Sequence, residues 1–204
     1  MNPQNNEIED FITQYTNQLS LAINSIDIQG FKSIADLLES TIKSGKTIFT
    51  SGNGGSSSIA EHFVCDFLKG TATSSTIQPI IHSLTSNTPT ITAVANDICY
   101  EEIFSHQIAK YGKSGDVLLS ISSSGNSENI IRGIEKAKAL NIKTISFVGF
   151  DGGRAKLSSD YSIHIPVKNY GVVEDTHHSL MHMLAQYLRL KNLKDEDNVE
   201  KIIF

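Results

Sequence analysis

Short apolar runs alternate with stretches of helical spacing over most of this chain, and this alternation constrains the fold more than any other feature. The runs are rich in β-branched residues, and they predict strands at residues 47–50, 117–121, 144–148 and 161–165. Helical spacing predicts helices at 59–68, 130–140 and about 172–190. This order is typical of parallel β-α-β units with helices on both faces of the sheet. The sequence therefore predicts an α/β fold whose ligands bind outside the carboxyl ends of the strands.

The first 45 residues are interpreted as two helices joined by a turn near residues 27–30. Phe11, Tyr15 and Leu19 recur at helical spacing in the first of them. Because these helices precede the first strand, we expect them to pack on another element or on another subunit. The predicted organisation is a helical extension at 1–45, an α/β domain at 46–192 and a C-terminal tail at 193–204.

Composition excludes several classes of function. The formal net charge is −5 and no basic run occurs, whereas binding to a phosphate backbone needs clustered Lys and Arg. No stretch approaches the roughly 20 apolar residues that span a membrane, and the polar, acidic start of the chain is unlike a signal peptide. Cys65 and Cys99 form neither a disulfide framework nor a CxxC pair. We expect a cytoplasmic protein that binds neither nucleic acid nor a membrane.

Two loops rich in serine and glycine follow predicted strands. In the first, residues 51–58, glycines allow a close approach of the backbone, and the next helix N-terminus favours an anion. An ordinary β-α turn with a serine N-cap explains this loop equally well. The second, residues 122–127, places four serines around one glycine and contains no lysine, so it is not a P-loop. Its hydroxyl groups suit the oxygens of a sugar phosphate, and we expect phosphate to bind there.

Acidic and histidine side chains recur at helical spacing on two of the predicted helices. His62 and Asp66 lie four residues apart, and so do Glu174, His178 and His182 in turn. Carboxylates and imidazoles on facing helices can form a site that zinc accepts. The alternative is a set of solvated polar side chains. Asp175 and His177 point elsewhere at this spacing.

Four motifs occur in a fixed order and carry a family resemblance. They are GNGGS after the first strand, AND at 95–97, ISSSGNS after a later strand and FDGG at 150–153. Together they resemble the SIS (sugar isomerase) domain phosphoheptose isomerases from about residue 47 through the last helix. The resemblance implies a parallel five-stranded sheet flanked by helices, with an N-terminal helical extension. It also implies a homotetramer with its sites at subunit interfaces.

The resemblance implies roles for individual residues as well. One zinc ion per subunit would be held by His62, Asp66, Glu174 and His182. The substrate would contact Asn53, Gly54, Gly55, Ser56, Asn96, Asp97, Ser122, Ser123, Ser124, Ser127 and Glu174. Asp66 stands where the family motif HFAEE has Glu, and Glu174 stands where the family has Gln. A family arginine after the first helix is missing, and Lys69 lies at that place.

The activity implied is that of an aldose–ketose isomerase. The reaction that the resemblance favours converts sedoheptulose 7-phosphate to D-glycero-D-manno-heptose 7-phosphate through an enediol. One group must move a proton between C1 and C2, and a second must handle the protons on O1 and O2. The resemblance assigns these roles to Asp66 and His182, with Glu174 as the alternative base. Two other functions stay open: an isomerase of another sugar phosphate for surface polysaccharide, and a non-catalytic SIS module that senses a sugar phosphate or binds a protein.

Overall fold

The computed structural model describes residues 3–194 and is built around a sheet of five parallel strands. The strands lie in the order β2-β1-β3-β4-β5. Their bounds are β1 Thr47–Gly52, β2 Ile80–Ser83, β3 Val117–Ser122, β4 Lys143–Val148 and β5 Tyr161–His164. The predicted α/β fold with a parallel five-stranded sheet is confirmed. Four strands match the predicted runs to within two residues at each end.

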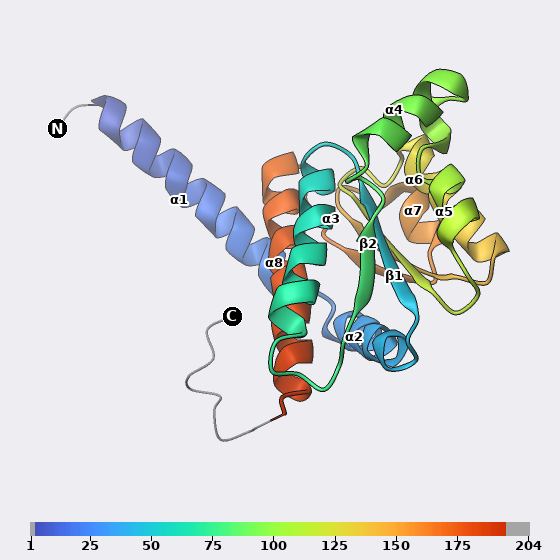
Figure 1. Ribbon diagram of the computed structural model, residues 1–204. Helices are drawn as coiled ribbons and strands as arrows, with labels where there is room; N and C mark the ends of the chain where they lie inside the picture. Colours follow the sequence, from blue (N-terminus) through green and yellow to red (C-terminus); the bar gives the residue numbers. More distant parts are fainter. Residues whose placement is uncertain (1–2, 195–204) are drawn as a thin grey trace.

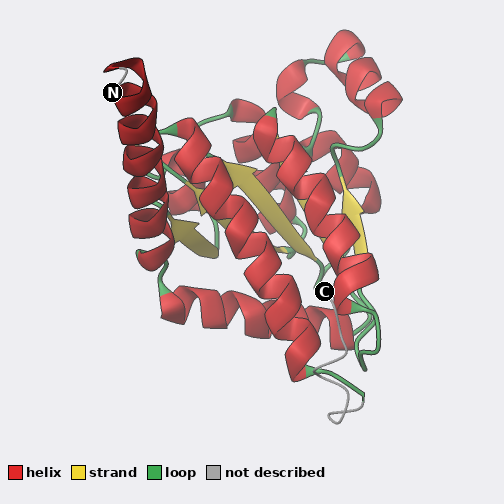
Figure 2. Cartoon of the chain, turned by 90° about the vertical axis from the view of Figure 1, so that its left-hand side faces the viewer, coloured by secondary structure: helices red, strands yellow, loops and turns green. Residues whose placement is uncertain are grey.

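Helices cover both faces of this sheet (Figures 1 and 2). Their bounds are α1 Pro3–Asn24, α2 Ile28–Lys43, α3 Gly55–Cys65, α4 Thr88–Asp97, α5 Ser105–Tyr111, α6 Glu128–Ala139, α7 Gly153–Ser158 and α8 Tyr170–Lys191. Side chains alternate between the faces along each strand. In β3, Val117 and Leu119 join the core under α2, α3 and α8, while Leu118 joins the core under α4 to α7.

Three parts of the fold differ from the sequence expectations. The edge strand β2 was not indicated, because it has only four residues and a largely exposed pattern. Helix α3 begins at Gly55, ahead of the predicted residue 59, and passes at Asp66 into a π-helix that ends at Thr71. The short helices α4, α5 and α7 were also not indicated. The predicted tail at 193–204 lies outside the described residues from 195 onward.

The two helices of the N-terminal extension pack differently. α2 lies along the sheet and buries Ile34 and Leu38 completely. α1 packs against α8 through its C-terminal half, and its N-terminal half projects from the body (Figure 1). Ile8, Phe11 and Ile12 on that projecting half are exposed. Within residues 3–194, no helix is long and apolar enough to cross a membrane.

The loop after β3 is braced by the loop after β4. Gly125 adopts a left-handed φ of 66°, and its carbonyl accepts a hydrogen bond from the Ala155 backbone N–H at 2.8 Å. A Cβ at Gly125 would lie 2.1 Å from the carbonyl oxygen of Gly152. Glycine is required here by the backbone angle and by the close approach of the two loops.

Replacing Gly125 by alanine therefore has two costs. Gly45 is the matched control, because it has a similar φ of 64° but open space within 4 Å of the point that a Cβ would occupy. We expect Gly45→Ala to lower the free energy of unfolding by about 1–2 kcal/mol through backbone strain alone. Gly125→Ala must also displace the Gly152 carbonyl, so we expect a clearly larger loss. Urea unfolding of both variants measures the difference, and equal losses would contradict this account of the loop.

Candidate active site

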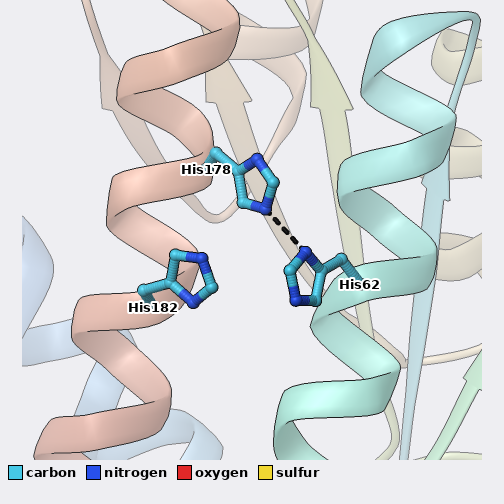
Figure 3. Close-up of side chains that lie close together, drawn as sticks. All are labelled: His62, His178 and His182. Carbon is cyan, nitrogen blue, oxygen red and sulfur yellow. Dashed lines mark hydrogen bonds between the residues drawn. The ribbon is translucent and has the colours of Figure 1, made fainter.

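Helices α3 and α8 lie side by side and present polar side chains to each other (Figures 1 and 3). His62 comes from α3, and His178 and His182 come from α8 (Figure 3). His178 Nε2 lies 2.7 Å from His62 Nδ1, and the rings of His178 and His182 are stacked with centroids 4.9 Å apart. Asp66, at the end of α3, lies beside His182. We call these four residues the histidine seam.

Asp66 is the most buried member of the histidine seam, with 9% of its surface exposed. Its Oδ2 lies 2.7 Å from His182 Nδ1, and its Oδ1 lies 3.3 Å from His62 Nε2. Because a carboxylate only accepts, the His182 Nδ1–H donates to it, and His182 Nε2 is left for another partner. His62 can donate to Asp66 in the same way while its Nδ1 accepts from His178. The sequence expectation that His62 and Asp66 share a helical face is confirmed.

Three imidazoles of the histidine seam could hold a metal ion. One nitrogen from each of His62, His178 and His182 lies within 4.8 Å of the other two. Burial lowers the pKa of His178, and the neighbouring His62 and His182 lower it further. A neutral imidazole has the free lone pair that a metal needs. His178 stood outside the ligand set implied by the resemblance, although its spacing on α8 was visible in the sequence.

Glu174 lies one turn before His178 on the same helix. Its carboxylate rests on the backbone of Gly55, the first residue of α3, where a Cβ would come within 2.3 Å of Oε2. Burial raises the pKa of the Glu174 carboxyl, and the nearby Asp175 raises it further. Among the described residues, the Glu174 side chain makes no hydrogen bond.

Two other ionisable residues of α8, Asp175 and His177, point away from the histidine seam, as expected. Asp175 accepts a hydrogen bond of 2.6 Å from the Tyr15 hydroxyl of α1, and this bond is the main cause that raises the pKa of Tyr15 to about 12. His177 is completely buried, and its ring lies against Phe147 of β4. Burial lowers the pKa of His177 to about 4, with the Val148 backbone acting in the opposite direction.

The first loop is joined to the start of α6 by a pair of side-chain amides. Asn53 and Asn129 exchange two hydrogen bonds of 2.9 Å, and the Tyr100 hydroxyl donates to Asn53 Oδ1 at 3.1 Å. Gly54 has a φ of 54° and precedes α3, and Ser56 is buried in its first turn. The two serine-rich loops therefore lie next to each other at the carboxyl edge of β1 and β3.

The second loop has hydroxyl groups whose hydrogens are not used by its own turn. Ser122 Oγ accepts a hydrogen bond from Gly125 N, and Ser124 Oγ accepts a weak one from Asn126 N at 3.3 Å. Ser127 starts α6 without a side-chain cap bond. Ser123 Oγ is buried and has no hydrogen-bond partner among the described residues. The turn leaves donors available at the N-terminus of α6, where an anion is favoured.

The remaining predicted residues lie outside the histidine seam and the serine loops. Asn96 and Asp97 end α4, where the Asn96 amide donates to Asp97 Oδ1 at 2.7 Å. Tyr100, which belongs to none of the sequence motifs, makes the contact from this region to the first loop. Lys69 is exposed on the π-helix.

Comparison with known proteins places the chain in a family. A family model described as the SIS domain matches residues 10–149. The probable phosphoheptose isomerase of Thermoplasma acidophilum is 36% identical over 176 residues, covering 84% of this chain and 94% of the relative. The phosphoheptose isomerase of Clostridium acetobutylicum is 37% identical over 158 residues, covering 78% and 80%. A solved phosphoheptose isomerase structure from Francisella tularensis superposes with a TM-score of 0.83 at 27% identity, covering 91% of this chain and 98% of that one.

The family model identifies the class of protein, and the two relatives identify the group within that class. The chain belongs to the SIS domain family and, within it, to the phosphoheptose isomerases. The family resemblance and the enzyme class expected from the sequence, an aldose–ketose isomerase, are confirmed. The roles of individual residues and the division into domains stay predictions.

The buried His177 gives the fold an acid-sensitive element. Its pKa is about 4 in the folded chain against 6.5 as the ordinary value, so the unfolded chain takes up the proton first as pH falls. The contribution of a neutral His177 is complete above pH 6.5 and is lost as pH falls toward 4. Between pH 7 and pH 4, we expect the free energy of unfolding of His177→Leu to fall by about 3 kcal/mol less than that of the wild type. Urea unfolding of both proteins across this pH range measures the difference. Parallel curves of unfolding free energy against pH for the two proteins would contradict this expectation.

Proposed function

We propose that this isomerase interconverts sedoheptulose 7-phosphate and D-glycero-D-manno-heptose 7-phosphate. The supporting observation is the pair of hydroxyl-rich loops at the carboxyl edge of the sheet, the first of which leads into α3 and the histidine seam, in a chain that belongs to the phosphoheptose isomerases. The loops offer donors for a phosphate group, and the histidine seam offers groups that can move protons. A phosphorylated ketose needs both at once.

The phosphate group of the substrate binds the second loop in this proposal. Ser122, Ser123, Ser124 and Ser127 donate hydroxyl hydrogens to it, and the N-terminus of α6 adds the favourable end of its dipole. The sugar chain then extends past the first loop, with Asn53, Gly54, Gly55 and Ser56 beside it. Asn96 and Asp97 complete the substrate-binding set that we carry over from the family pattern.

The proton chemistry belongs to the groups between α3 and α8. In the version without a metal, His182, held at Nδ1 by Asp66, exchanges protons with O1 and O2 through Nε2. The carbon proton goes to a carboxylate, for which Asp66 and Glu174 are the two candidates. The heptose phosphate formed in this way is suited to the synthesis of a surface polysaccharide.

The activity is tested by incubating purified protein with a panel of ketose phosphates and following products by NMR. We expect turnover of sedoheptulose 7-phosphate in preference to shorter ketoses. Ser124→Ala should raise KM about tenfold or more, because a hydrogen bond to a charged group contributes about 1.5–3 kcal/mol, and the fold should stay intact. Ser33→Ala on α2 is the control and should leave KM unchanged. An absence of turnover for every ketose phosphate would favour a sensing or protein-binding module.

We further propose that the histidine seam binds one zinc ion per subunit. The three imidazoles within 4.8 Å of one another are ligands that zinc accepts, and the Asp66 carboxylate bound to His182 Nδ1 is a usual second partner of such a histidine. The family pattern places Asp66 and Glu174 in the ligand set with His62 and His182. A zinc ion bound there would polarise the carbonyl oxygen of the substrate.

Zinc content separates the metal-dependent version from one in which His182 acts without a metal. We expect about one equivalent of zinc in tag-free protein purified without chelator. His178→Ala should weaken zinc binding by about tenfold or more, whereas His106→Ala on α5 should not. Elemental analysis and competition with a chelator measure both quantities. Less than about a tenth of an equivalent of any transition metal, with activity indifferent to chelator, would remove zinc from the proposal.

Assembly and location complete the proposal. A homotetramer with sites at subunit interfaces is supported by the exposed Ile8, Phe11 and Ile12 on the projecting part of α1. Light scattering that gives a stable monomer at micromolar concentration would refute it. Residence in the cytoplasm is supported by Cys65 and Cys99, both of which are free thiols.

A further inference from the structure

Asn53 and Asn129 form an amide pair at the carboxyl edge of the sheet, and their hydrogen bonds define which end of each amide is the oxygen. The Ile130 backbone N–H, which can only donate, bonds to Asn129 Oδ1 at 2.9 Å. The Asn129 Nδ2 group therefore faces Asn53 and donates to Asn53 Oδ1, while Asn53 Nδ2 donates to Asn129 Oδ1, each at 2.9 Å. The first turn of α6 thus sets the orientation of both amides.

Tyr100 is the second donor to Asn53. Its hydroxyl donates to Asn53 Oδ1 at 3.1 Å, so this oxygen accepts two hydrogen bonds and both of its lone pairs are used. Asn53 Nδ2 has two N–H groups, and within residues 3–194 only one of them is bonded. The side chain of Asn53 therefore keeps a single free group, and that group is a donor.

The free N–H of Asn53 lies where an oxygen atom of a ligand would bind. Asn53 follows β1 directly and is half-buried, and Asn129 lies two positions after Ser127 of the second loop. The free donor is thus placed between the two serine-rich loops. An N–H without a partner is unfavourable once it is removed from water, and an oxygen atom of a bound sugar phosphate would satisfy it.

Helix α6 holds both partners of Asn53 in place. Asn129 belongs to α6 and is 2% exposed. Tyr100 belongs to the short 3₁₀ helix Tyr100–Glu102, and Arg132 of α6 donates to Glu102 Oε1 of that helix at 2.7 Å. The Tyr100 side chain is not part of the core, since 52% of its surface is exposed. Loss of its hydroxyl should therefore leave the fold intact.

We infer that Asn129 and Tyr100 are positioning residues that make Asn53 a hydrogen-bond donor toward the substrate. The inference rests on the proposed function, in which Asn53 lies beside the sugar phosphate. Asn129 and Tyr100 act through the amide of Asn53 and not through contacts of their own with the substrate. The atom that Asn53 binds is an oxygen of the sugar phosphate that accepts a hydrogen bond.

The test is a double-mutant cycle with sedoheptulose 7-phosphate as the substrate. Tyr100→Phe removes only the hydroxyl, and we expect KM to rise about three- to tenfold, the effect of one hydrogen bond, with kcat changed less than about twofold. Asn53→Ala should raise KM at least as much. In the Asn53→Ala protein, Tyr100→Phe should have no further effect on KM, because the amide through which Tyr100 acts is absent.

Tyr111→Phe on α5 is the matched control. Tyr111 is 56% exposed, and its hydroxyl makes no hydrogen bond among the described residues, so both kinetic constants should stay unchanged. Asn129→Ala removes the other partner of Asn53, and we expect it to raise KM about three- to tenfold as well. Circular dichroism and urea unfolding establish that each variant is folded. If Asn129→Ala is unstable, Tyr100→Phe decides the test.

Two results would overturn the inference. One is an unchanged KM in Tyr100→Phe. The other is a double variant in which the effects of Tyr100→Phe and Asn53→Ala multiply, since Tyr100 would then act independently of Asn53. Either result, obtained with an active wild type, leaves the proposed function standing. A wild-type protein that converts no ketose phosphate overturns both the inference and the proposed function.

Discussion

The contact of Asp66 with His182 and His62 is the interaction on which the proposed site depends. A buried carboxylate must be paired, because its removal from water is unfavourable without compensating partners. Asp66 meets this need with one imidazole from α3 and one from α8. The same bonds fix which nitrogen of His182 stays free. The Asp66 side chain therefore joins the two helices and orients the His182 ring.

The loops at the carboxyl edge depend on a second set of contacts. The amides of Asn53 and Asn129 join the turn after β1 to the helix after β3. Gly125 lets the turn after β3 pack directly on the loop that precedes α7. These contacts occupy backbone and amide groups, and the hydroxyls of Ser122 and Ser124 only accept, so their hydrogens stay free to donate. A rigid frame with spare donors is what a phosphate site requires, because the donors need little ordering when the ligand binds.

Much of this arrangement could be predicted from the sequence. The strands other than β2 are short apolar runs, which can be recognised from neighbouring residues alone. Helix α8 has a long uninterrupted helical pattern. The ordered motifs located both loops, and spacing by fours placed His62 with Asp66 and Glu174 with His178 and His182. The edge strand β2 was missed because it is half exposed, so its burial does not appear as a continuous apolar run.

Other features depend on contacts between distant residues. The π-helix that begins at Asp66 packs against α8, and no local sequence pattern indicates it. The bonds of Tyr15 to Asp175 and of Tyr100 to Asn53 join residues 160 and 47 positions apart. His178 could have been included in the metal set, since its spacing was visible, but only the meeting of α3 and α8 brings it to His62. Glu174 likewise gained its distinct environment from Gly55, a residue of another helix.

The most direct test of this account is a crystal structure with an alditol 7-phosphate, the reduced form of the proposed substrate, which binds but cannot isomerise. The account predicts the phosphate in the loop at 122–127 and the C1–C2 end of the sugar at the histidine seam, beside His182. A phosphate bound elsewhere with this loop empty, or a C1–C2 end that lies away from the histidine seam, would contradict it.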